Sequence, residues 1–210
     1  MGDAAISLLS PLDRHLALHG LALRKAAVAE DIGELVGLSR ATVDAVLAWA
    51  EAGGRIALAG GKYMLTVPAQ VALRAEYSRF YQTQRASAAM RAAYDQFEFI
   101  NTDLKRLITD WQTIEVGGER VVNDHANKDY DRQVIDRLGA LHERFEPVLA
   151  RMATSLPRLT IYGRLLLAAL EKAEDGANEW VSDVRLPSYH TVWFEMHEDL
   201  LRVMGRTREE

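Results

Sequence analysis

VAEDIGELVGLSRATVDAVLAWAEAGGRIALAGGKYMLT, which runs from Val28 to Thr66, is the stretch from which the architecture of this chain follows. Its opening segment, 28–36, carries apolar residues at helical spacing and predicts a short helix. Gly37 ends that helix, because glycine readily takes the left-handed conformation that terminates helices. Ser39 then caps a second helix, since its hydroxyl can accept a hydrogen bond from a free amide of the first turn.

The second helix of this stretch also has one apolar face, and it is predicted to end at the glycine pair 53–54. Two β-prone runs follow, 55–59 and 62–66. Gly60 and Gly61 join them and suit a tight hairpin turn. Helix, tight turn, helix and two-stranded hairpin is the layout of a winged helix-turn-helix. The residues predicted to face the core from the second helix are Val43, Val46, Leu47 and Ala50.

The same residues resemble the winged-helix transcription regulators of the MarR family and its relatives. The resemblance is carried by the run ELVGLSRATV (34–43) and by the run GGKYMLT (60–66) that ends the hairpin. It covers about the first third of the chain. It implies a DNA-binding regulator, although a fold by itself does not determine a function.

The resemblance also implies which residues meet DNA. In a winged helix, the second helix of the motif enters the major groove with its N-terminal residues leading. Ser39 and Thr42 would then contact phosphate, and Arg40 would pair with O6 and N7 of guanine. Arg55 and Lys62 flank the hairpin and would contact the DNA backbone. The alternative is that Ser39 only caps its helix and Arg40 is a solvated charge.

Charge gives this interpretation less support. The chain has a net charge of −5, and residues 1–66 carry six basic and seven acidic residues. DNA binding gains much of its affinity from cations that meet phosphates. An alternative therefore stays open, in which the winged helix serves dimerisation or the docking of a protein partner.

Composition limits the other possibilities. The 210 residues suffice for one large or two small domains, and 49% of them are hydrophobic. The absence of cysteine excludes disulfides, cysteine zinc ligands and cysteine nucleophiles. The amino terminus lacks the basic front and apolar run of a signal peptide, and no apolar stretch approaches the ~20 residues that span a bilayer. We expect a cytoplasmic protein without a membrane partner.

We expect a mainly α fold in three parts. These are a winged-helix domain over 1–67, a long connector helix and dimerisation region over 68–111, and an all-α C-terminal domain over 112–210. The apolar positions between residues 90 and 107 have near-heptad spacing, which is typical of a helical dimer seam and predicts a homodimer. Two helices packed within one subunit are the alternative.

The rest of the chain yields a coarser prediction. An opening helix is expected over Asp3–His19, unless Ser10 or Pro11 starts a new one. A short strand over Leu21–Lys25 would pair with the hairpin. The segment 112–128 reads as a loop that can hold a second hairpin, 113–122, around its glycine pair. Further helices are predicted over Tyr130–Thr154, Arg158–Ala173 and Ser188–Met204, with a short helical turn over Glu179–Val184.

The C-terminal half carries a candidate effector site. Its densest aromatic stretch is YHTVWFEMHEDLL, residues 189–201. Aromatic residues can line an apolar pocket, and arginines favour carboxylate or phosphate groups. An ordinary helical core is the alternative. The residues predicted to bind a small-molecule effector are Trp111, Arg158, Tyr162, Arg164, Trp193 and His197.

No catalytic motif emerges. The run 54–62 has the wrong glycine spacing for a phosphate loop, and no G-x-S-x-G or G-x-G-x-x-G motif occurs. His190 and His197 lie seven residues apart, which leaves a metal-dependent enzyme as a further alternative, but a histidine on an apolar face is usually hydrogen-bonded core. We expect no cofactor and no metal. The sequence favours a homodimeric, non-enzymatic transcription regulator that binds double-stranded DNA and responds to an effector.

Overall fold

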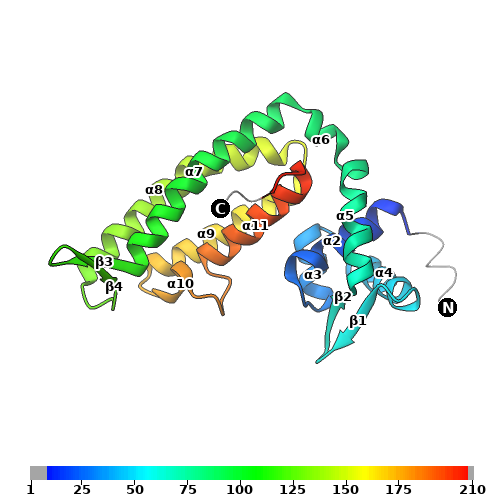
Figure 1. The fold of residues 1–210 in the computed structure, drawn as a ribbon, viewed down its shortest axis with the longest axis horizontal. Coiled ribbons are helices and arrows are strands. Elements are labelled where there is room, and N and C mark those ends of the chain that lie inside the picture. Colours follow the sequence, from blue (N-terminus) through cyan, green and yellow to red (C-terminus); the bar gives the residue numbers. More distant parts are fainter. Residues whose placement is uncertain (1–8, 208–210) are drawn as a thin grey trace. The chain divides into compact units, whose positions relative to one another are not determined.

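The computed structural model describes residues 9–207 and is mainly helical over that range, with two small antiparallel hairpins (Figure 1). The chain forms two compact units. The first contains the chain up to Ala86 together with the residues from Glu198 onward, and the second contains Ser87–His197. The predicted divisions after residues 67 and 111 therefore differ from the units that the contacts define. No helix in the described range is long and apolar enough to cross a membrane.

The first unit opens with α2, Pro11–Arg24. Ser10 caps this helix, because its Oγ accepts the Asp13 N–H at 3.0 Å while the Asp13 carboxylate accepts the Ser10 N–H at 3.3 Å. The new helix start predicted as an alternative at Ser10 or Pro11 is therefore present, and residues 3–8 of the predicted opening helix lie outside the described residues. The predicted strand over Leu21–Lys25 is wrong, because α2 continues through it.

Two short helices follow, α3 (Ala29–Val36) and α4 (Arg40–Ala52). Gly37 lies between them at φ 73°, in the left-handed region that terminates a helix. Both helices direct their apolar faces inward. The residues buried there include Ile32, Leu35, Val43, Val46 and Leu47.

The first hairpin pairs β1 (Ile56–Ala59) with β2 (Lys62–Leu65). The turn consists of Gly60 and Gly61, both with positive φ, as a two-residue hairpin turn of this kind requires. One further bridge holds the hairpin, because Ala27 and Tyr63 exchange backbone hydrogen bonds of 3.1 and 2.9 Å. The extended contact predicted at residues 21–25 is thus made just after α2.

The predicted connector is not one helix. It consists of α5 (Val67–Phe80), α6 (Gln82–Ala86) and α7 (Ala88–Gln112). Ser87 caps α7 by accepting the Met90 N–H at 3.2 Å. Arg85, just before this cap, donates to the carbonyls of Val203 and Arg202 at 2.7 and 3.0 Å. Arg85 thereby satisfies carbonyls at the end of a helix that comes later in the chain. A single continuous connector helix would not provide this tertiary contact.

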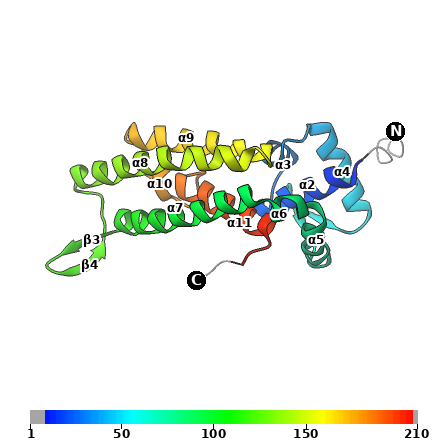
Figure 2. The same ribbon diagram turned by 90° about the horizontal axis from the view of Figure 1, so that it is seen from above.

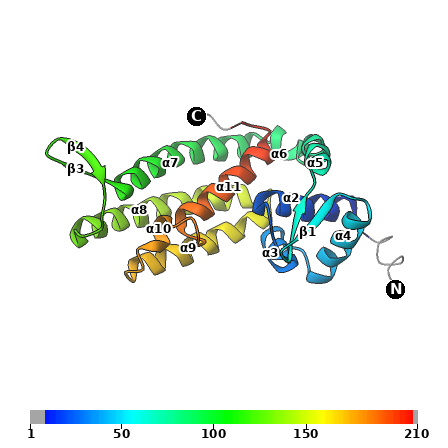
Figure 3. The same ribbon diagram turned by 60° about the horizontal axis from the view of Figure 1, so that its bottom comes forward.

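The second unit is built on the antiparallel pair α7 and α8 (Lys128–Ala153), which lie side by side in Figures 1 and 2. Between them, β3 (Thr113–Val116) and β4 (Glu119–Val122) form the second hairpin. It projects beyond the ends of α7 and α8 (Figure 3). The predicted hairpin at 113–122 is confirmed, so the C-terminal region is not all-α. Further elements are η1 (Pro157–Leu159), α9 (Thr160–Glu174), α10 (Glu179–Ser182) and α11 (Tyr189–Met204).

An aromatic cluster fills the core of the second unit. Phe97 of α7, Phe145 of α8 and Trp193 of α11 have ring centroids 4.5–6.1 Å apart. The indole Nε1 of Trp193 donates to Oδ1 of Asn101 at 3.0 Å, which satisfies its only polar hydrogen. These contacts attach α11 to the α7–α8 pair.

Candidate functional site

The first turn of α4 is exposed at Ser39, Arg40 and Ala41. The Oγ of Ser39 accepts the Thr42 N–H at 3.1 Å and lies 2.8 Å from the Thr42 hydroxyl. Ser39 is therefore a helix cap, and the two hydroxyls are hydrogen-bonded to each other. This turn brings together three of the five residues predicted to contact DNA.

Arg40 is engaged by carboxylates. Its Nε lies 2.8 Å from both Asp44 oxygens, and Nη1 forms an ion pair with Glu30. Asp31 and Glu34 are exposed on the neighbouring helix α3, so the surface around Arg40 is acidic. All three partners of this cluster are about half exposed, and ion pairs at such positions contribute only about 0–1 kcal/mol.

The other two predicted DNA residues lie apart from this turn. The Arg55 guanidinium lies 4.3 Å from the ring centroid of Trp49, and the Arg14 guanidinium lies 4.8 Å from the same ring. Arg55 also lines a cavity of about 270 Å³ together with Glu76. Lys62 is exposed at the hairpin turn.

The six residues predicted to bind an effector are not gathered in one place. His197 and Trp193 pack against Glu98 and Asn101 of α7, whereas the ring of Trp111, at the far end of α7, has its centroid 4.5 Å from that of His125. Glu98 and Trp111 are thirteen residues apart, which is about 20 Å along a helix, so no small pocket can contain both ends. Tyr162 is buried in α9, Arg158 is half-buried in η1 and Arg164 is exposed.

Most histidines of the described range have a hydrogen-bonding partner rather than a shared metal site. His197 Nε2 lies 3.0 Å from the Glu98 carboxylate, His142 Nδ1 lies 3.1 Å from the Tyr189 hydroxyl, and His125 Nδ1 lies 3.0 Å from Asp131. Within residues 9–207, no group of three or more potential ligands is placed to hold a metal ion. Burial lowers the pKa of His142 and of His190.

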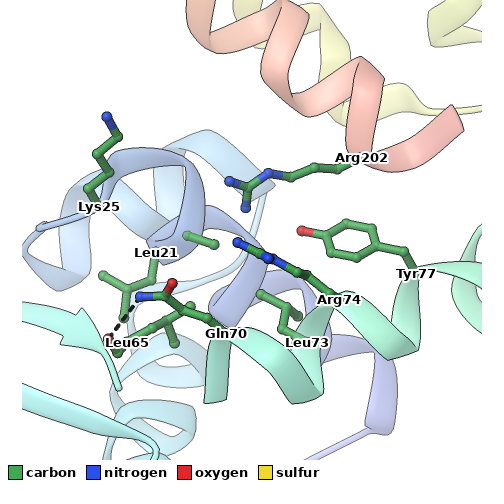
Figure 4. Close-up of a pocket in the computed structure, with 9 residues that line it drawn as sticks. Leu21, Lys25, Leu65, Gln70, Leu73, Arg74, Tyr77 and Arg202 are labelled. Carbon is green, nitrogen blue, oxygen red and sulfur yellow. Dashed lines mark hydrogen bonds between the residues drawn. The ribbon is translucent and has the colours of Figure 1, made fainter. Parts of the chain in front are cut away.

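A different cavity is present in the first unit (Figure 4). It has a volume of about 340 Å³, and Leu21, Leu65 and Leu73 supply its apolar surface. Helices α2 and α5, strand β2 and the end of α11 all contribute to its lining. Its volume lies at the lower end of the range for small-molecule sites.

The polar lining of this cavity is cationic. It comes from Lys25, Arg74, Tyr77 and Arg202, with the amide of Gln70 donating to the Leu65 carbonyl at 3.3 Å. Figure 4 shows the guanidinium groups of Arg74 and Arg202 directed toward one another, with the Tyr77 hydroxyl beside them.

A buried hydrogen-bonded chain lies behind Tyr77. Its hydroxyl is 2.6 Å from His19 Nδ1, and His19 Nε2 is 2.9 Å from Oδ1 of Asp199. All three side chains are buried. Burial raises the pKa of Tyr77 well above its ordinary value, so the phenol is neutral and donates to His19 when the ring donates to Asp199. The Arg202 guanidinium lies beside the Tyr77 hydroxyl in Figure 4, and its Nε donates to Glu198 at 2.8 Å.

Comparisons with protein-family models, with curated proteins and with solved structures found no match for this chain. The evidence for function is therefore the geometry of two sites, the exposed first turn of α4 and the cationic cavity.

This cavity could not be predicted from the sequence. Lys25 follows α2, Arg74 and Tyr77 lie three residues apart on α5, and Arg202 comes more than 120 residues later. The spacing of Arg74 and Tyr77 placed them on one helical face, but nothing in the sequence indicated that Arg202 would face them.

Proposed function

We propose that the first unit is a winged helix that binds double-stranded DNA and that the protein is a transcription regulator. The order α2, α3, α4, β1 and β2 supports this proposal, together with the Ala27–Tyr63 bridge that holds the hairpin. The observation that carries it is the exposed first turn of α4, because a recognition helix must offer that turn to the major groove.

The charges around Arg40 determine how such binding would work. Arg40 has to exchange its carboxylate partners for a guanine edge, and the exposure of its ion pairs makes that exchange inexpensive. Glu30 and Asp44 would nevertheless repel the phosphates. We therefore expect modest affinity that weakens steeply as salt rises.

The regulator would act in the cytoplasm, without catalytic activity, as a homodimer. Dimeric helix-turn-helix proteins place two recognition helices on half-sites about 34 Å apart. Analytical ultracentrifugation of the full chain would test the dimer, and a single species of about 23.5 kDa would count against it.

Arg40→Ala tests the proposal. A duplex selected from a random pool by the wild-type chain should bind this variant more weakly by about 1–3 kcal/mol, measured by fluorescence anisotropy at several salt concentrations. Lys105→Ala, which removes an exposed charge from α7, is the matched control. Asp44→Asn should tighten binding, because it removes a negative charge beside the groove. Equal affinities of the wild type and Arg40→Ala would contradict base recognition by α4.

A second candidate function has its own observation. The two carboxylates on Arg40, with Asp31 and Glu34 nearby, form an acidic surface that suits a basic protein partner. In that case no duplex would be selected from the pool, and Asp44→Asn would weaken binding of the partner. The response to Asp44→Asn therefore separates the two functions by its sign.

A further inference from the structure

The cavity between α2, β2, α5 and the end of α11 has an unusual charge for this chain. Among the described residues that line it, three are cations, Lys25, Arg74 and Arg202, and none carries a carboxylate. Glu198 pairs with Arg202 from outside the lining. A net positive cavity in a chain of net charge −5 points to a ligand of negative charge.

The guanidinium groups of Arg74 and Arg202 are directed toward each other in Figure 4. Like charges so placed repel, and an anion between them turns that repulsion into two attractions. Guanidinium groups also match carboxylate and phosphate oxygens in geometry, with two parallel N–H donors each.

We propose that this cavity binds a small organic anion. Arg74 and Arg202 hold its carboxylate or phosphate group, Lys25 adds a third positive charge at the edge, and the apolar body lies on Leu21, Leu65 and Leu73. The two halves of the cavity thus select one chemistry, an acidic group attached to a compact apolar body.

The buried chain fixes one side of this site before a ligand arrives. Asp199 holds His19 and His19 holds Tyr77, whose hydroxyl lies beside the Arg202 guanidinium in Figure 4. Glu198 holds the same arginine from the other side. A donor fixed in advance loses little conformational freedom on binding, which favours affinity. Arg74 is exposed, and it can move onto the anion from α5.

The backbone at Lys25 agrees with this assignment. Lys25 has φ 64° and ψ −47°, and the Ala26 N–H donates to the Arg24 carbonyl at 2.7 Å across it. This is the rare, strained form of γ-turn, which a lysine rarely adopts. Strain of this kind concentrates at ligand sites, where it places a side chain.

The proposal is independent of DNA binding, because the ligand is measured on the protein alone. Isothermal titration calorimetry of the full chain at low ionic strength, where screening is small, would use phenyl phosphate, benzoate, inorganic phosphate and benzyl alcohol. We expect phenyl phosphate or benzoate to bind more tightly than inorganic phosphate, and benzyl alcohol not to bind. The tighter of the two aromatic anions identifies the acidic group.

Arg74→Gln should weaken that anion by about tenfold to a hundredfold, as expected for loss of a charged hydrogen bond. Arg79→Gln, on the same helix but outside this cavity, should bind like the wild type. Because Arg74 is exposed, circular dichroism should show both variants folded. The proposal is overturned if no anion binds, if benzyl alcohol binds as tightly as phenyl phosphate, or if Arg74→Gln and the wild type have equal affinities.

Discussion

Replacing Lys25 by glycine should stabilise the first unit, although it removes a side chain. The reason is the positive φ of 64° at this residue, which lies in a region where a Cβ atom is unfavourable. The structure shows no ion pair or hydrogen bond of the Lys25 ammonium with residues 9–207, so the substitution removes no such contact from the folded chain.

The expected gain follows from two opposing contributions. A non-glycine residue in a sparsely populated backbone region costs about 1–3 kcal/mol in the folded state. Glycine loses more conformational freedom on folding than other residues, which costs about 0.5–1 kcal/mol. The free energy of unfolding should therefore rise by about 0.5–2 kcal/mol in Lys25→Gly.

Urea unfolding, followed by circular dichroism, would measure this gain, with Lys25→Ala as the matched variant. Alanine removes the same ammonium group but keeps the Cβ, so the difference between the two variants isolates the backbone contribution. Lys25→Gly should be more stable than Lys25→Ala, while both should bind phenyl phosphate more weakly than the wild type. If Lys25→Ala is as stable as Lys25→Gly, the turn is not strained and the reasoning fails.

Two further predictions concern the second unit. Burial lowers the pKa of His142 and His190, which favours their neutral form in the folded protein. Below about pH 6.5 the same side chains take up protons in the unfolded chain, so lowering the pH should destabilise the second unit. His142→Gln should flatten the slope of unfolding free energy against pH, by at most about 1.4 kcal/mol per unit. Asn123→Ala should lower the free energy of unfolding by about 1–3 kcal/mol in urea, because it removes the amide donor of the buried Trp111 carbonyl and one of the two amide donors of the Asp131 carboxylate, leaving that of Asn178. An unchanged pH slope or unchanged urea midpoint would contradict these two predictions respectively.

The elements that could be predicted from the sequence depend on local signals. Ser10 and Ser39 cap the helices that follow them, and Gly37, Gly60 and Gly61 have the positive φ that their turns require. Each of these effects involves residues at most a few positions apart. A sequence read in order contains all the information needed for them.

The missed features depend on residues far apart in the chain. The predicted connector helix is interrupted between α5 and α7. Arg85 lies close to that interruption and donates to the carbonyls of Arg202 and Val203, which come 117 and 118 positions later in the chain. The cationic cavity was missed for the same reason, since α2, α5 and α11 must first pack together before Arg202 can face Arg74. Helical periodicity describes one helix at a time and cannot supply that information.

Arg40 illustrates a third case, in which the sequence contains a local signal for an ion pair. Asp44 lies four residues after Arg40, and that spacing places the two side chains together on a helix. The consequence reaches beyond the ion pair, because the surface around Arg40 is acidic whereas the lining of the cavity is cationic. Within residues 9–207, Arg40 has two carboxylate partners, whereas Arg74, Arg202 and Lys25 together have one, Glu198. A small anion should therefore bind in the cavity and not at α4, so that Arg40→Ala leaves the affinity for phenyl phosphate unchanged while Arg74→Gln reduces it. If the first unit binds DNA as proposed, a duplex would compete for Arg40 because it offers many phosphates and base edges at once, which a single small anion does not.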